Sequence, residues 1–426
     1  MSGDRFAVVG LARVRSPWFG AVAGWANSSQ LPIDFHKCVS AADVHRHLES
    51  GLAIDALLVD GDAPGVDRDL LQAVRRHGSA VLVVVDHDDA TDWPERGATS
   101  TLPRPVEAEA LLSALRSAVG PGAGTGRRTS TSPPDGTSGV EVPDADDARW
   151  RGRLVAVTGP PGCGRSTIAI ALAQGLGAIA GNEGAVVLAD LAARADLAMY
   201  HDVGDVMPGV QELVDTHRRS APTRSEVRSM VWDIEQRGYS LLLGLRRPRH
   251  WTELREPGVT SALDALRAAF RHVVADIDAE LDGRAETGST DIADRNAAAR
   301  VTTSEADLVL VCGDATMRGV HALARAERDL IDAGLDATRL LLVVNRAPRS
   351  PRVRAEITRT LAALTDDDRS TGAVAMGPVF LPDRAQVEVA HRVAGPLPSA
   401  LTDPLVTTVT AMLGHLAGRP AGDREQ

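Results

Sequence analysis

Short apolar runs alternate with segments of helical periodicity along the first 119 residues. The apolar runs have the length of buried strands, and they cover residues 6–10, 54–60, 80–85 and 100–102. Helical patterns lie between these runs, and a last one covers residues 106–119. Strands that alternate with helices form parallel sheets, because each parallel connection must cross over the sheet. The pattern predicts a small α/β domain over residues 1–118.

The same alternation restarts after residue 149 on a larger scale. Six strand-like runs cover residues 154–158, 185–190, 240–245, 272–276, 308–312 and 340–345. Their helical connectors predict a doubly wound, mostly parallel sheet within a domain over residues 150–418. Residues 404–416 have apolar side chains at helical spacing and no Lys or Arg, which favours a packing helix over a membrane anchor.

The segment between the two predicted domains differs in composition from both. Residues 119–149 are rich in Gly, Ser, Thr, Pro and Asp and nearly lack large apolar side chains. Such a segment cannot bury enough apolar surface to fold, so it is interpreted as a flexible linker. Residues 419–426 are interpreted as a short polar tail.

The amino-acid composition argues against several classes of function. The chain has 46 Lys and Arg against 57 Asp and Glu, and the net charge of −11 opposes general binding to nucleic acids. The three cysteines, Cys38, Cys163 and Cys312, are too few for a disulfide framework or a zinc site. No signal peptide and no run of eighteen apolar residues is found. We expect a cytoplasmic protein with at most peripheral contact at the inner face of the plasma membrane.

One glycine-rich segment lies between a predicted strand and a predicted helix. It consists of Gly159, Pro160, Pro161, Gly162, Cys163, Gly164, Arg165, Ser166 and Thr167. Except at Arg165, it matches the phosphate-binding pattern G-x-x-x-x-G-K-[ST], in which backbone N–H groups and a helix N-terminus hold phosphate oxygens. Arginine keeps the charge but replaces a compact ammonium with a planar fork, so binding can survive where catalysis is lost. The alternative is a plain glycine-rich turn.

Two acidic residues end predicted strands near this loop. Asp190 and Asp276 occupy positions from which carboxylates hold magnesium or its waters, and the Ser166 hydroxyl is the expected third magnesium ligand. The same two aspartates are the candidates for a catalytic role. The alternative interpretation is that they are ordinary turn formers after strands.

Residues 150–400 resemble the MinD/ParA group of deviant phosphate-loop ATPases, and most closely its CpaE/TadZ-like branch, which includes septum-site-determining proteins. The resemblance rests on the loop and on residues 186–203, 241–251, 270–278, 340–347 and 379–398. It implies ATP and Mg²⁺ as cofactors, and a role for Asn345 in recognising the adenine base. It also implies a part in septum placement during cell division, or in assembly of a pilus or secretion apparatus.

Three departures from that group concern hydrolysis. Pro160 stands where the group has its signature lysine, and Arg165 stands where it has the loop lysine. Ala192 stands where it has the aspartate that orients the attacking water. Because positioning and charge stabilisation make up most of phosphoryl-transfer catalysis, we expect ATP binding with weak or no hydrolysis. The alternatives are an active ATPase that uses Arg165 and a nucleotide-free structural adaptor. The expected partners are division or pilus and secretion proteins, or a second copy of the chain; nucleic acid is not expected.

Residues 5–118 resemble a response-regulator receiver domain. Asp60 ends a predicted strand and Pro64 follows four residues later, which is the spacing found at the phospho-accepting aspartate of receivers. Residues 97–105 resemble the sequence at the last strand of a receiver. The acidic pair after the first strand is absent, and Arg104 stands where the family has lysine. Without those acids there is little to hold the magnesium that phosphorylation requires. The prediction is therefore a pseudo-receiver used for dimerisation or docking.

Two short basic clusters remain. They comprise Arg246, Arg247, Arg249 and His250, and then Arg349, Arg352 and Arg354. A solvated or partner-binding face is the usual role of such short runs. We predict that role for both clusters in preference to DNA binding.

Overall fold

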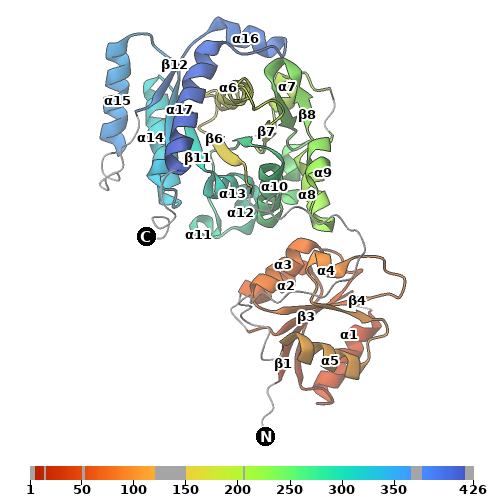
Figure 1. Cartoon of the computed structure of the whole chain (residues 1–426). Coiled ribbons are helices and arrows are strands. Elements are labelled where there is room, and N and C mark those ends of the chain that lie inside the picture. Colours follow the sequence, from red (N-terminus) through yellow and green to blue (C-terminus); the bar gives the residue numbers. More distant parts are fainter. Residues whose placement is uncertain are drawn as a thin grey trace. The chain divides into compact units, whose positions relative to one another are not determined.

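The computed structural model describes residues 5–13, 16–49, 53–119, 150–204, 207–365 and 377–417. Apart from Val119, the predicted linker lies outside the described residues, as does the predicted tail. The described residues form two compact units, each built around its own sheet (Figure 1). The predicted domain boundaries themselves stay predictions.

The first unit has a five-stranded sheet in which every pair of neighbouring strands is parallel. Its strands are β1 (Phe6–Leu11), β2 (Ile33–Cys38), β3 (Ala56–Asp60), β4 (Ala80–Val85) and β5 (Ser100–Pro103), in the order β2-β1-β3-β4-β5. Its helices are α1 (Pro17–Asn27), α2 (Ala41–Glu49), α3 (Arg68–Arg76), α4 (Trp93–Arg96) and α5 (Ala108–Val119). The four strands that the sequence analysis located are present, and β2 is an edge strand that it did not locate.

Helices cover both faces of this sheet. Successive strand residues point to opposite faces, so Leu58 packs with α1 and α5 while its neighbour Leu57 packs with α2, α3 and α4. Helix α3 begins where the Asp67 carboxylate accepts a hydrogen bond from the Leu70 N–H at 2.9 Å. The central strands β3 and β4 are nearly continuous apolar runs because both of their faces are buried.

The second unit is built on an eight-stranded sheet. Its strands are β6 (Arg153–Thr158), β7 (Val186–Asp190), β8 (Trp232–Ile234), β9 (Tyr239–Leu242), β10 (His272–Asp276), β11 (Leu308–Asp314), β12 (Leu340–Ala347) and β13 (Val379–Pro382). Their order is β13-β12-β11-β6-β10-β7-β9-β8, and only β8 runs antiparallel to its neighbour. The predicted doubly wound, mostly parallel α/β fold is confirmed, with β8 and β13 added at the two edges.

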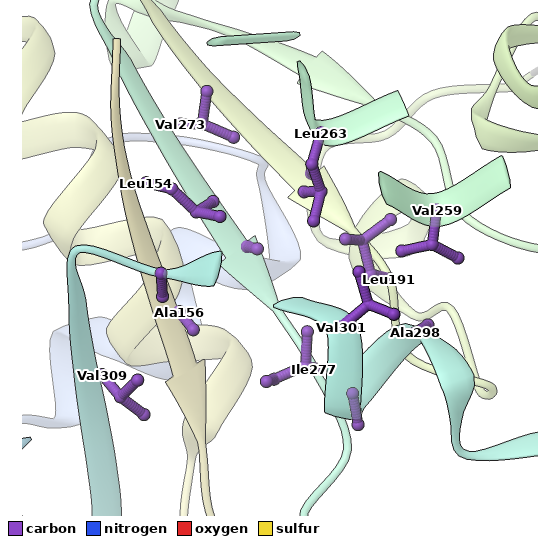
Figure 2. Packing of buried hydrophobic residues seen from close by; sticks show 14 of the residues in the cluster. Leu154, Ala156, Leu191, Val259, Leu263, Val273, Ile277, Ala298, Val301 and Val309 are labelled. Carbon is purple, nitrogen blue, oxygen red and sulfur yellow. The ribbon is translucent and has the colours of Figure 1, made fainter. Parts of the chain in front are cut away.

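Helices of the second unit lie on both faces of its sheet (Figure 1). They are α6 (Arg165–Gly177), α7 (Leu197–Tyr200), α8 (Val210–Arg219), α9 (Arg224–Ser229), α10 (Glu256–Ala269), α11 (Arg284–Thr287), α12 (Thr290–Arg295), α13 (Ala297–Glu305), α14 (Met317–Asp332), α15 (Pro351–Thr365), α16 (Ala385–Arg392) and α17 (Ser399–Ala417). Figure 2 shows part of the apolar cluster on one face, where Leu154 and Val273 of the sheet pack with Leu263 of α10 and Val301 of α13.

The other face of the sheet holds α6 and α17. Leu405, Val409 and Leu413 of α17 are buried in one cluster with α6, which confirms the predicted packing helix. Helix α6 carries Gly175 where α17 crosses it, and an added Cβ there would overlap the side chain of Val406. Among the described residues, no helix is both long enough and apolar enough to cross a membrane.

Strand β6 marks the point at which the chain changes direction along the sheet. From β6 the chain continues to β7 on one side of the sheet, and it later adds β11, β12 and β13 on the other side. Ligands of doubly wound folds bind at the carboxyl ends of strands at such a switch point. The loop after β6 therefore stands where the fold itself favours a ligand.

Candidate functional site

The backbone of the loop between β6 and α6 requires its glycines. Gly159, Gly162 and Gly164 have φ values of 150°, 84° and 89°, in the left-handed region that other residues rarely adopt. A Cβ on Gly159 would overlap the carbonyl oxygen of Cys312, and one on Gly164 would overlap the amide nitrogen of Asn345. The loop is thus a tightly packed turn and not merely a flexible connection.

The loop nevertheless leaves room beside Gly162. A Cβ on Gly162 would meet no atom within 4 Å. Helix α6 begins at Arg165, and the N–H groups of a helix's first turn have no partner within the helix. Open space next to the N–H donors at the positive end of a helix suits a phosphate group. The residues present therefore fit the phosphates that the sequence pattern predicts.

Arg165 lies against two carboxylates in this structure. Its Nε donates a hydrogen bond to Oδ1 of Asp276 at 2.5 Å, and its Nη1 donates to Oδ1 of Asp278 at 3.2 Å. Burial alone would lower the pKa of Arg165, but the two carboxylates outweigh burial and raise the pKa above its ordinary value. The guanidinium is permanently charged and already paired.

Asp190 and Asp276 lie side by side at the ends of neighbouring strands. The register of β7 and β10 pairs the two residues directly. Oδ2 of Asp190 accepts a hydrogen bond from the Leu197 N–H at 2.9 Å, and its Oδ1 has no hydrogen-bond partner among the described residues. Burial raises the pKa of both carboxyl groups, and the charge of Asp276 raises that of Asp190 further. Both are aspartates that the sequence analysis identified as strand ends near the loop, and their role there stays a prediction.

Ser166 completes the set of expected magnesium ligands. Its hydroxyl donates to Oδ2 of Asp276 at 2.6 Å. Within the described ranges, no group of three or more His, Cys, Asp or Glu side chains is arranged around a common metal position. Magnesium keeps several waters and phosphate oxygens and needs only one or two protein ligands, so Ser166, Asp276 and the unpaired oxygen of Asp190 fit it. Their role as magnesium ligands stays a prediction.

Asn345 fastens the loop to β12. Its Nδ2 donates to the carbonyl oxygen of Cys163 at 2.9 Å, and its Oδ1 accepts from the Arg346 N–H at 2.9 Å. Arg346 has a left-handed φ of 50°, and its exposed guanidinium donates to the Gly162 carbonyl at 3.2 Å. The structure thus gives the buried Asn345 amide a structural task, while its recognition of adenine stays a prediction.

Two residues of the site were missed by sequence reasoning. Asp278 contacts Arg165, and its Oδ2 accepts from the Ala193 N–H at 2.7 Å. His391 of α16 shares a hydrogen bond of 2.9 Å between its Nε2 and the Thr167 hydroxyl. The Asp-Ile-Asp spacing after β10 was a visible signal for Asp278, whereas nothing in the sequence pointed to His391.

The loop thiol is not a nucleophile. Cys163 is buried, and burial raises its pKa to about 11. Cys38 and Cys312 are also buried and free of disulfide bonds. At neutral pH these thiols are protonated and behave as small apolar groups.

Members of the two basic clusters have local partners. Arg246 forms an ion pair with Glu212, and Arg354 lies over the ring of Phe380 while its Nε donates to the Pro348 carbonyl at 2.7 Å. These contacts lie within the second unit, and the solvated or partner-binding face that the sequence predicted stays a prediction.

In the first unit, Arg104 covers Asp60. The two form an ion pair, and Arg104 also lies 3.1 Å from Asp86 and 3.5 Å from Asp62. The Ser16 hydroxyl donates to the other oxygen of Asp60 at 3.2 Å. Both oxygens of the buried Asp60 carboxylate are thus engaged within the unit.

Comparison with known proteins gives structural likenesses only. No protein-family model matches the sequence, and no curated protein is significantly similar to it. Similar solved structures include a ParA family ATPase from Chlorobium tepidum, with 14% identity, a TM-score of 0.46, and coverage of 61% of this chain and 98% of that chain. The septum site-determining protein MinD of Pyrococcus horikoshii, complexed with Mg-ADP, has 16% identity, a TM-score of 0.45, and coverage of 63% and 99%.

A McdA variant from Cyanothece in complex with ATP has 16% identity, a TM-score of 0.44, and coverage of 62% of this chain and 96% of that chain. Identities and TM-scores at this level do not establish the family. The function proposed below therefore rests on the residues of this chain.

Proposed function

We propose that the second unit binds ATP with magnesium and acts as a MinD/ParA-like regulator with weak or no hydrolysis. One observation carries the proposal: the loop after β6 holds three left-handed glycines, opens α6, leaves space beside Gly162 and sets Ser166 against Asp276. A turn that merely joins a strand to a helix has no need of this combination. Bound magnesium would supply the positive charge that neutralises the nucleotide's phosphates.

The expectation of weak hydrolysis rests on the same site. Pro160 and Ala192 carry no group that could stabilise charge or orient a water molecule. Arg165, the cation of the loop, is bound by Asp276 and Asp278. Since phosphoryl transfer depends on positioned charges, turnover should be several orders of magnitude below that of a complete site.

For the whole chain we propose a regulator or localisation factor in septum placement or in pilus or secretion assembly. This part of the proposal is supported by the sequence resemblance and by the degenerate site, since a protein that holds a nucleotide without consuming it acts through partners. We propose protein partners, including a second copy of the chain, and a cytoplasmic location with at most peripheral membrane contact.

The first unit is proposed to be a pseudo-receiver that serves as a docking module. Arg104 holds the Asp60 carboxylate, and the acidic pair that would bind magnesium is absent from residues 9–11. Mass spectrometry after treatment with acetyl phosphate and magnesium tests this. We expect no phosphorylation of Asp60, and stoichiometric phosphorylation would refute the proposal for this unit.

Calorimetric titration with ATP and magnesium, combined with a turnover assay, tests the proposed function. We expect saturable binding with negligible turnover, and weaker binding by Ser166→Ala in the presence of magnesium. Turnover well above background that Asp276→Ala abolishes would favour the active ATPase. Absence of binding by the folded protein would favour the structural adaptor and refute the proposal.

A further inference from the structure

Asp278 accepts hydrogen bonds from residues at the ends of three elements of the second unit. It follows β10 by two residues, and its Oδ1 accepts from Nη1 of Arg165 at the start of α6. Its Oδ2 accepts from the Ala193 N–H after β7, and its backbone carbonyl accepts from the Thr158 hydroxyl at 3.0 Å. Nothing in the phosphate-loop pattern requires a carboxylate at this position.

The two carboxylates engage Nε and Nη1 of Arg165, which are two of the three nitrogens with which a guanidinium binds a phosphate. A guanidinium presents its N–H donors in a flat fork that fits two oxygens of a carboxylate or a phosphate. In this structure Nε is directed at Asp276 and Nη1 at Asp278. A phosphate that binds the fork through two oxygens must use an edge that includes Nε or Nη1, so it competes with one of the two carboxylates.

The two carboxylates differ in how easily they can leave. The Asp276 side chain is 2% exposed, lies 2.5 Å from Nε and also accepts from Ser166. The Asp278 side chain is 33% exposed and lies 3.2 Å from Nη1. The longer contact at the more exposed group is the weaker one, because solvent screens it. Asp278 is therefore the carboxylate that an incoming phosphate displaces.

We propose that Asp278 sets the nucleotide affinity of the loop by competing, as an internal carboxylate, with phosphate for the Arg165 guanidinium. The inference rests on the proposed function, because it concerns the same site. Without nucleotide, Asp278 holds Arg165 at the base of the loop. Binding of nucleotide transfers Nη1 from Asp278 to a phosphate oxygen, and the free energy needed to separate the ion pair lowers the affinity.

Asp278→Asn tests the competition with little change in shape. Asparagine can still accept the Ala193 N–H, and the Thr158 contact goes to the backbone, but the negative charge is gone. Because the variant removes a charge-assisted hydrogen bond that must break on binding, the dissociation constant for ATP with magnesium should fall about tenfold. Thermal unfolding without nucleotide confirms that the variant is folded, and Asp278→Ser repeats the test with a smaller neutral side chain.

Glu280→Gln is the matched control. It removes the same charge two residues further along, from an exposed side chain that is not among the hydrogen-bond partners of Arg165 in the described structure. A general electrostatic effect would act on both variants. We expect the control to change the dissociation constant by less than about twofold, because exposed charges are screened.

The outcomes separate the inference from the proposed function. Tighter binding by Asp278→Asn alone supports the inference. Binding by this variant where the unaltered protein shows none also supports the inference, but it refutes the proposed binding of ATP by the unaltered protein. If the unaltered protein binds ATP and Asp278→Asn binds no tighter than Glu280→Gln, the inference fails and the proposed function stands. If none of these folded proteins binds, both fail.

Discussion

Two glycines of the phosphate loop provide a matched pair of substitutions. Gly162 and Gly164 have nearly the same left-handed φ, 84° and 89°. A Cβ on Gly162 meets open space, whereas a Cβ on Gly164 overlaps the amide of the buried Asn345. Alanine at either position carries the same backbone cost. Only Gly164→Ala also displaces the side chain that fastens the loop to β12.

The expected difference in stability follows from these contacts. The left-handed conformation costs alanine about 1–2 kcal/mol at either position. Displacing Asn345 leaves the Cys163 carbonyl without its buried donor, which costs a further ~1–3 kcal/mol. In a domain of this size 1 kcal/mol shifts the unfolding temperature by about 2–4 °C. For an added 2 kcal/mol, Gly164→Ala should therefore unfold about 4–8 °C below Gly162→Ala.

Differential scanning calorimetry of the unaltered protein and both variants measures this difference. The first unit carries neither substitution, so its unfolding transition serves as an internal reference. Equal unfolding temperatures for the two variants would refute the reasoning, because the contact with Asn345 would then contribute nothing to the loop.

Three further predictions concern other parts of the molecule. Because burial raises the pKa of Asp190 above its value in the unfolded chain, the stability that its protonated form contributes is lost as pH rises above ~4. The stability of Asp190→Asn relative to the unaltered protein should therefore increase as pH rises above ~4; a difference between their unfolding temperatures that does not change with pH would contradict this. Gly175→Ala should destabilise the second unit by about 1–3 kcal/mol despite alanine's better helix propensity, and adding Val406→Ala should recover most of the loss in denaturant unfolding. Arg104→Met should destabilise the first unit by about 3 kcal/mol because the buried Asp60 loses its counter-ion, and an unchanged transition of that unit would count against the ion pair.

Apart from the edge strand β5, the strands that the sequence predicted lie inside their sheets and are buried on both faces. Such strands are continuous apolar runs, and β10 has the predicted bounds, 272–276. The missed strands lie at sheet edges. In β2 only Ile33 and Cys38 are buried, while the residues between them include Asp34, His36 and Lys37. A strand paired on one side needs fewer apolar side chains, so its pattern is weak.

The sequence identified most of the residues that form the site, but it did not predict the contacts between them. The loop pattern and the strand ends located Arg165, Ser166, Asp190 and Asp276. That Arg165 is bound by Asp278 could not be predicted, because the contact joins residues 113 positions apart and depends on side-chain conformations. Asn345 was expected to meet a ligand, but its amide also supports the loop through its hydrogen bond to the Cys163 carbonyl, which joins residues 182 positions apart.

A crystal structure with a non-hydrolysable ATP analogue and Mn²⁺ in place of Mg²⁺ tests the central claim most directly. We predict that the phosphates lie over the N–H groups at the start of α6, and that an anomalous peak marks Mn²⁺ bound to the Ser166 hydroxyl, with Asp276 beside it. Crystals that hold the analogue elsewhere, or that show this loop closed over itself at saturating analogue, would contradict the account.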